Sequence, residues 1–161
     1  MITTGEPDSS ATKTEVVDVV NGESCADLAN FPLEIRDAVG ANLHGTPVVC
    51  GGRYSSSYYF MLTLCYKYTN SGWQQFASMK EKRGYVAGVM HKNKFHVFGG
   101  AYYSGDWIRS KMTELISIDG VVEYDPELPE AVEYHAITSI NSTVSLLSGG
   151  YTNTYSPLTW Y

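Results

Sequence analysis

The chain lacks the long apolar run that a membrane-spanning helix requires. None of its apolar stretches approaches the roughly 18 residues needed to cross a bilayer as a helix. Residues 1–11 are polar and contain no apolar segment of the kind found in secretory signal peptides, so none is expected in the chain as given. With 43% apolar and 17% charged residues among 161, the composition indicates a globular chain rather than a disordered one.

Basic residues are missing from the last third of the chain. Residues 112–161 contain no Lys or Arg and seven acidic residues, and residues 1–52 carry two basic and eight acidic residues. Residues 53–111 reverse this balance with nine basic and two acidic residues. Nucleic acid is not expected as a partner, because both acidic flanks would repel phosphates. The charges either complement one another between neighbouring units or attract an acidic partner to the middle third.

Arrangements typical of catalysis are also missing. No Ser/His/Asp, Cys/His or paired-carboxylate set can be placed by spacing, and no glycine-rich phosphate loop opens a helix. His91 and His96 flank one predicted turn, but two histidines without a third ligand are typical of a surface rather than a metal site. No metal and no cofactor are therefore expected.

Glycine pairs, by contrast, recur at a nearly constant interval. Gly51-Gly52, Gly99-Gly100 and Gly149-Gly150 are 48 and 50 residues apart. The stretches that end in these pairs each predict a strand, a short turn and a second strand. The predicted turns are 43–46, 91–94 and 141–143.

Strand-like segments precede each of these hairpins, so each repeat is predicted to contain about four short strands, which is one propeller blade. The fold predicted is all-β, a partial β-propeller of about three four-stranded blades. The predicted boundaries are a polar N-terminal segment at 1–13, an incomplete or degenerate repeat at 14–52, repeats at 62–100 and 111–150, and the start of a fourth blade at 157–161.

The second repeat carries the residues of a known pattern. Gly51-Gly52 is followed by Tyr66, by Trp73 after six intervening residues, and by a closing Val97-Phe98-Gly99-Gly100. This pattern resembles the kelch repeat, and the resemblance covers roughly residues 14–161. It implies structural roles for Tyr66, Trp73 and the glycine pairs. Because propellers typically have about four to eight blades, either further blades in cis or a second copy of the chain would be needed to close the ring.

The three cysteines, Cys25, Cys50 and Cys65, leave two alternatives open. Cys50 and Cys65 are either small core residues or a disulfide that joins neighbouring strands of a blade. Cysteines that flank a glycine pair in this way resemble those of secreted metazoan kelch proteins. The location expected is extracellular if the bond forms and cytoplasmic otherwise.

The loops after the glycine pairs are rich in Tyr, Ser and Gly, a composition typical of binding loops. All three begin at the same repeat position and should therefore lie along one edge of the propeller, where per-repeat loops often bind partners. The candidate binding residues are Arg53, Tyr54, Tyr58, Tyr59, Tyr102, Tyr103, Trp107, Tyr151 and Tyr155. The alternative is that these tyrosines pack on blade edges.

These features favour a protein-interaction module whose partner is a protein or peptide. An acidic peptide would suit Arg53 beside the tyrosines, and a sugar would also suit exposed aromatic rings. The alternatives are an extracellular structural or carbohydrate-binding repeat protein, or part of a galactose-oxidase-like enzyme propeller, one of the kelch-type families. The chain is not expected to be an enzyme by itself, because no residues match the oxidase ligand pattern.

Overall fold

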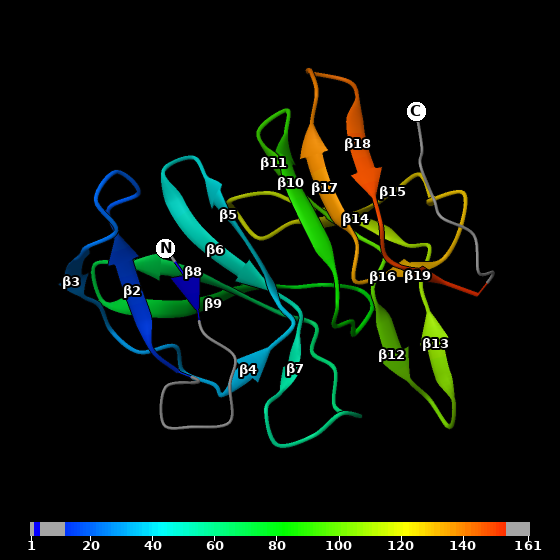
Figure 1. The fold of residues 1–161 in the computed structure, drawn as a ribbon, viewed down its shortest axis with the longest axis horizontal. Coiled ribbons are helices and arrows are strands. Elements are labelled where there is room, and N and C mark those ends of the chain that lie inside the picture. The colour runs from blue at the N-terminus through cyan, green and yellow to red at the C-terminus, as the bar shows by residue number, and fades with distance from the viewer. Residues whose placement is uncertain (1, 4–11, 154–161) are drawn as a thin grey trace.

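The protein folds entirely into strands, turns and loops over the residues that the structure describes. A computed structural model describes residues 2–3 and 12–153, and no helix is present among them (Figure 1). The prediction of an all-β fold is confirmed. Within this part of the chain there is accordingly no helix that could cross a membrane. Tyr155 and the predicted fourth-blade segment, 157–161, lie outside the described residues.

Two four-stranded antiparallel sheets form the centre of the molecule. The first has the order β5-β6-β8-β9, and its strands are Val39–Leu43, Thr46–Cys50, Leu64–Thr69 and Gly72–Ser78. The second has the order β10-β11-β14-β15, and its strands are Ala87–His91, Lys94–Phe98, Thr113–Ile116 and Val122–Asp125. In both sheets the strands lie side by side in the order in which they follow one another along the chain, so the two sheets are successive copies of one unit.

Smaller sheets flank this pair. An N-terminal three-stranded sheet contains β1 (Ile2–Thr3), β2 (Thr14–Val17) and β3 (Ser24–Asp27). A hairpin of β17 (Ala136–Ser139) and β18 (Ser145–Ser148) follows the second four-stranded sheet and packs against β10 (Figure 1). Three short pairs complete the fold: β4 (Ile35–Arg36) with β7 (Arg53–Tyr54), β12 (Ala101–Tyr103) with β13 (Trp107–Arg109), and β16 (Val132–Glu133) with β19 (Tyr151–Thr152).

The sheets are out of phase with the predicted repeats. Each four-stranded sheet takes its first two strands from before a glycine pair and its last two from after it. The predicted repeat 62–100 therefore supplies β8 and β9 to one sheet and β10 and β11 to the next. The physical reason is that the glycine pair lies between the second and third strands of a sheet, where the chain turns back, and not between two sheets.

The hairpin turns form where the sequence predicts them, with one difference. His44 and Gly45 have φ values of 54° and 81°, and Lys92 and Asn93 have 44° and 66°, as a two-residue turn of type I′ requires. In the third hairpin Ser139 pairs with Ser145, so the turn is longer and spans 140–144. Upstream of this turn, equivalent residues of the third unit therefore lie further from the glycine pair than in the other two units.

An apolar core fills the space between the two four-stranded sheets. The first sheet contributes mainly Leu43, Val48 and Cys50, and the second contributes Phe95, Val97 and Ile116, all of them at most 1% exposed. Cys50 and Cys65 are directly paired residues of β6 and β8, with Cα atoms 4.1 Å apart, and they are joined by a disulfide. Of the two alternatives for these cysteines, the structure shows the bonded one.

A buried ion pair ties the second sheet to the loop that precedes it. Arg83 and Glu114 are both fully buried, and Arg83 Nη2 donates to Glu114 Oε1 at 2.7 Å. Arg83 Nη1 also donates to the carbonyl oxygens of Gly99 and Met112, at 2.8 and 2.6 Å. Glu114 Oε2 accepts from the backbone N–H of Lys80 at 2.6 Å. Burial of these two charges is possible because each has several polar partners.

Tyr66 and Trp73, the structural residues expected from the resemblance, pack at the outer side of the first sheet. Phe31 lies edge-on to both rings, with centroid distances of 5.1 Å to Tyr66 and 4.9 Å to Trp73. Trp73 Nε1 donates to Thr14 Oγ1 of the N-terminal sheet at 3.0 Å. These contacts join the N-terminal sheet to the first four-stranded sheet.

Candidate functional site

The glycine pairs close the units against one another. Gly52 N donates to Arg83 O at 2.9 Å and Gly100 N donates to Val132 O at 2.8 Å, so each of the first two pairs bonds to the unit that follows it. Gly100 has a φ of 91°, and a Cβ placed there would lie 2.5 Å from the carbonyl oxygen of Gly84. Only glycine fits this combination of left-handed backbone and close approach.

A short backbone relay runs beside the glycine pairs. Asp37, Tyr85 and Tyr134 are equivalent residues of the three units, and all have left-handed φ values, of 59°, 57° and 56°. Tyr85 N donates to Asp37 O at 3.0 Å, and Tyr134 N donates to Tyr85 O at 3.2 Å. The relay brings three equivalent side chains to one end of the molecule.

Sequence reasoning missed these three residues. Their spacings of 48 and 49 residues are a signal that could have found them. Counting back 14 residues from each glycine pair instead places His135 opposite Asp37 and Tyr85, because this count does not allow for the longer third turn.

Arg53 is buried in the centre of the predicted loop surface. Its side chain is 4% exposed, and its Nε donates to Asp37 Oδ2 at 2.7 Å. The guanidinium also lies over the ring of Tyr58, 4.1 Å from the centroid, and 5.5 Å from that of Tyr85. The charge of Arg53 is thus balanced within the fold, and the guanidinium serves as the support on which the neighbouring rings stack.

The tyrosine rings continue from Arg53 towards the third unit. The rings of Tyr85 and Tyr134 have centroids 4.4 Å apart, and Tyr151 lies edge-on to Tyr134 at 6.0 Å. Burial, and then its hydrogen bond with Tyr134, raise the pKa of Tyr85 well above its usual range. Burial also raises the pKa of Tyr134. Both hydroxyls are therefore protonated at neutral pH, and they are hydrogen-bonded to each other.

A second cluster supports the loop between β12 and β13. Trp107 Nε1 donates to both carboxylate oxygens of Glu133, at 2.9 and 3.0 Å, and Arg109 Nε lies 2.8 Å from the same carboxylate. Glu133 is only 3% exposed, so its charge is compensated by these donors. The Trp107 ring is 5.5 Å from that of Tyr85, which joins this cluster to the tyrosines.

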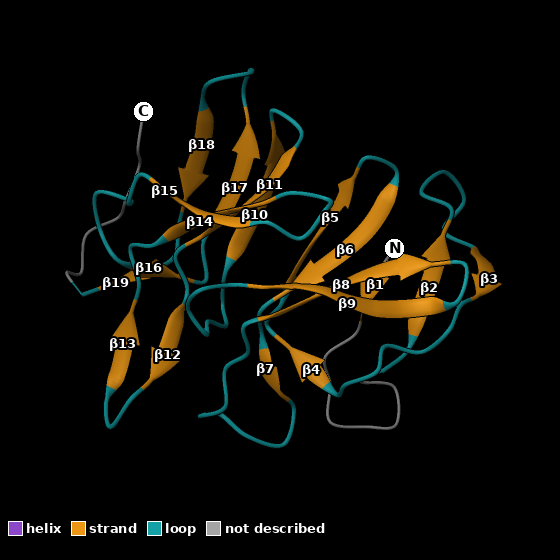
Figure 2. Cartoon of the chain, turned by 180° about the vertical axis from the view of Figure 1, so that it is seen from behind, coloured by secondary structure: helices purple, strands orange, loops and turns teal. Residues whose placement is uncertain are grey.

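Six aromatic residues form one surface, which we call the aromatic rim. They are Tyr58, Tyr59, Tyr103, Trp107, Tyr134 and Tyr151. Tyr59 and Tyr103 bring the loops of the first two units together, with ring centroids 4.5 Å apart. In Figures 1 and 2, β7, β12 and β13 lie at the lower edge, opposite the hairpin turns. Four of the six rings are more than half exposed: Tyr58, Tyr59, Tyr134 and Tyr151.

The remaining predicted site residues have other positions. Tyr54 packs with the buried cluster of Phe31 and Ile35, and Tyr102 packs against the cluster of Met61 and Tyr85. Tyr54 and Tyr102 therefore have the contacts expected of tyrosines that pack within the fold rather than of binding residues. Among the described residues, no group of three or more His, Cys, Asp or Glu side chains is placed to hold a metal ion.

Comparison with known proteins identifies the fold but not a family. No family model and no curated protein matches the chain. A solved structure does match. It is described as "Structure of YjhT", and it aligns with a TM-score of 0.71 at 14% sequence identity. The match covers 85% of this chain and 44% of that one, so this chain spans less than half the length of its structural neighbour. Identity this low shows a shared fold alone.

Proposed function

We propose that this chain is part of a kelch-type β-propeller and acts as a protein-interaction module that contacts its partner through the aromatic rim. The observation that carries the proposal is the convergence of exposed aromatic side chains from three successive units on one edge. Exposed aromatic clusters of this kind are uncommon on surfaces without a partner, and Tyr and Trp dominate the binding energy of many interfaces.

The repeated architecture supports the propeller part of the proposal. Two four-stranded sheets of identical strand order follow one another. They are followed by the β17–β18 hairpin, which corresponds to the first two strands of such a sheet. The glycine pairs of the kelch-like pattern take part in the contacts between units, since Gly52 and Gly100 each bond to the unit that follows. The third unit has two described strands where the others have four, and we propose that further blades in cis, or a second copy of the chain, complete it.

The chemistry of the rim favours a partner bound by ring contacts rather than by charge. Both arginines beside the rim are ion-paired, Arg53 with Asp37 and Arg109 with Glu133. The rim is held rigid by these pairs and by ring stacking, so little conformational freedom is lost when a partner binds. The partner proposed is a protein or peptide segment with apolar or proline-type side chains for the rings, and an acidic segment is the alternative.

The disulfide favours an extracellular role. Cys50 and Cys65 are fully buried and bonded, and such bonds persist in oxidising compartments. We therefore propose that the protein functions outside the reducing cytosol. Differential alkylation of the protein from its natural source, before and after reduction, would test this, because free thiols on both residues would contradict it.

The test of the interaction role is a double substitution on the rim. Tyr59→Ala and Tyr151→Ala together remove two rings that are 58% and 63% exposed. The matched control is Val19→Ala with Val20→Ala, which alters two residues 96% and 92% exposed in the N-terminal sheet turn. We expect proteins captured and crosslinked by the wild-type chain to be retained by the control and lost from the rim variant.

Equal capture by all three forms would refute the rim as the contact surface. A glycan array probed with the same three forms separates the sugar-binding alternative, because binding to glycans that depends on Tyr59 and Tyr151 would replace the protein partner by a carbohydrate. Capture that weakens steeply with added salt, and not with the loss of the rings, would instead favour the acidic partner.

A further inference from the structure

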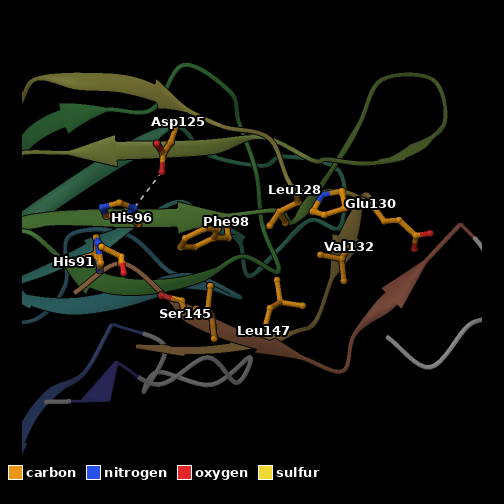
Figure 3. Close-up of a pocket in the computed structure, with 12 residues that line it drawn as sticks. His91, His96, Phe98, Asp125, Leu128, Glu130, Val132, Ser145 and Leu147 are labelled. Carbon is orange, nitrogen blue, oxygen red and sulfur yellow. Dashed lines mark ion pairs between the residues drawn. The ribbon is translucent and has the colours of Figure 1, made fainter. Parts of the chain in front are cut away.

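A cavity lies between the second four-stranded sheet and the β17–β18 hairpin, away from the aromatic rim. Its volume is about 370 Å³, which is within the range of small-molecule sites. Figure 3 shows His91, His96 and Asp125 at one end and Phe98, Val132 and Leu147 towards the other.

The cavity exists because one large side chain is replaced by a small one. In the strand register Ser145 of β18 corresponds to Phe95 of β11, and Leu147 corresponds to Val97. Phe95 is fully buried and fills the space between the two four-stranded sheets. Ser145 leaves the equivalent space open beside the hairpin, where it lines the cavity.

The opposite wall of the cavity is more polar than the equivalent surface of the first sheet. By the same register His91, His96 and Asp125 of the second sheet correspond to Leu43, Val48 and Ala77 of the first. The first-sheet residues belong to the apolar core, whereas their counterparts carry imidazole and carboxylate groups. Three such replacements on one wall are unfavourable for a simple sheet-to-sheet contact, because buried polar groups need polar partners.

The polar end contains the carboxylate of Asp125. Lys92 and Lys94 line an adjoining hollow that shares Asp125, and Lys94 is ion-paired with Glu123. Asp125 Oδ2 lies 3.3 Å from His96 Nδ1, which leaves further acceptor positions of the carboxylate free to bind another donor. Burial lowers the pKa of His96, so its ring is neutral at pH 7. Of the described residues that line the cavity none is Lys or Arg, and Glu130 adds a second carboxylate, although its side chain extends away from the other labelled residues in Figure 3.

We propose that this cavity binds a small organic ammonium compound, with its cationic group at Asp125 and an aromatic or branched aliphatic body against Phe98 and Leu147. The ammonium group donates to the carboxylate, and towards this group the neutral His96 ring can act only as an acceptor. The apolar body takes the space that Phe95 fills in the preceding unit. This site is independent of the aromatic rim and of any partner bound there.

The test uses the full chain and three probes of similar size: 2-phenylethylammonium, 2-phenylethanol and 3-phenylpropionate. Isothermal titration or ligand-observed NMR at pH 7 should show that the cation binds about tenfold or more tightly than the alcohol, because a charge-assisted hydrogen bond is lost with the alcohol. The carboxylate should bind most weakly, since Asp125 repels it.

Two variants with matched controls locate the site. Asp125→Asn should weaken binding of the cation about tenfold and bring it close to that of the alcohol. Glu127→Gln, at an exposed residue of the following loop that does not line the cavity, should leave binding unchanged. Ser145→Phe restores the residue type of the preceding unit and should abolish binding of both cation and alcohol. Leu146→Phe, its neighbour on the other face of β18, should not.

The proposal is overturned by any of three results. These are no binding of the cation by the wild-type chain at millimolar concentration, equal affinity for the cation and the alcohol, or unchanged binding in Ser145→Phe.

Discussion

The substitution Glu114→Gln is expected to be strongly destabilising because it removes one charge of a fully buried pair. Arg83 and Glu114 are each 0% exposed, so neither can regain solvent when the other is neutralised. Gln keeps the volume and one carbonyl acceptor of the side chain. It cannot neutralise the guanidinium, which stays protonated at any accessible pH.

The magnitude follows from what Arg83 retains. Its Nη1 still donates to two carbonyl oxygens, at 2.8 and 2.6 Å, so part of the desolvation of the guanidinium remains compensated. Breaking a buried pair by removing one partner typically costs about 3–5 kcal/mol. With two acceptors retained, we expect the lower part of this range, about 3 kcal/mol in the free energy of unfolding. For a chain of this size that corresponds to a fall in Tm of about 6–12 °C.

The control is an ion pair of the same chemistry at the surface. Lys94 and Glu123 bridge β11 and β15 with side chains 39% and 52% exposed, so Glu123→Gln should cost at most about 1 kcal/mol. Both variants should be compared with the wild-type chain by urea unfolding followed by tryptophan fluorescence, with the slope checked for constancy. If the two variants lost the same small amount of stability, the buried pair would stabilise the fold no more than the surface pair does.

Three further outcomes are expected. Gly100→Ala should lower the free energy of unfolding by about 3 kcal/mol or more, because its Cβ would lie 2.5 Å from a carbonyl oxygen. The control Gly105→Ala, with no atom within 4 Å of the new Cβ, should lower it by only about 1 kcal/mol because of its left-handed φ. Similar urea midpoints for the two variants would contradict the close approach at Gly100. Reduction of the Cys50–Cys65 disulfide, whose cysteines are 15 residues apart, should lower the free energy of unfolding by about 3 kcal/mol. Urea titrations with and without phosphine measure this change, and thiol counting checks that reduction is complete. An unchanged midpoint would argue against a stabilising role of the disulfide. Burial, and then the charge of Arg83, lower the pKa of His135 to about 4. Below about pH 6.5 the unfolded state therefore binds a proton that the folded state does not. As a result, stability that is present above pH 6.5 is lost as the pH falls towards 4. The difference between wild type and His135→Phe should change by about 2–3 kcal/mol between pH 7 and pH 4.5, and a difference independent of pH would refute the assignment.

The sequence was a good guide where local backbone geometry decides the structure. The glycine pairs and the turns at His44 and Lys92 were predictable because positive φ restricts the residues that fit. The phase of the sheets was not predictable from the repeat alone. A repeat of fixed length has no intrinsic starting point, and only strand pairing shows that β6 and β8 share a sheet across the glycine pair.

The candidate site was predicted in part. Tyr58, Tyr59 and Tyr151 are exposed, as binding residues must be, whereas Tyr54 next to Arg53 packs into an apolar cluster. In the two-residue strand β7 both neighbours are held within the fold, Arg53 by Asp37 and Tyr54 by the apolar cluster. A segment this short has too little alternation for sequence to show which side chains are buried. Whether these rings bind a partner remains a prediction.

The pairing of Arg53 with Asp37 could not be predicted from charge counts. The two residues are 16 positions apart and meet only because β4 pairs with β7. The same holds for Arg109 and Glu133, which come together from β13 and β16. A chain segment rich in basic residues can therefore leave a surface with little unpaired charge, because long-range strand pairing decides which charges neutralise each other.

The relay through Asp37, Tyr85 and Tyr134 has a consequence for changes in chain length. The units are joined through backbone bonds at the end opposite the hairpin turns, and the third turn is longer than the other two without disturbing the bond between Tyr134 and Tyr85. Extra residues inserted into these turns should be absorbed locally. They are therefore suitable positions for an affinity tag or a fluorescent label that reports on the molecule without touching its aromatic edge.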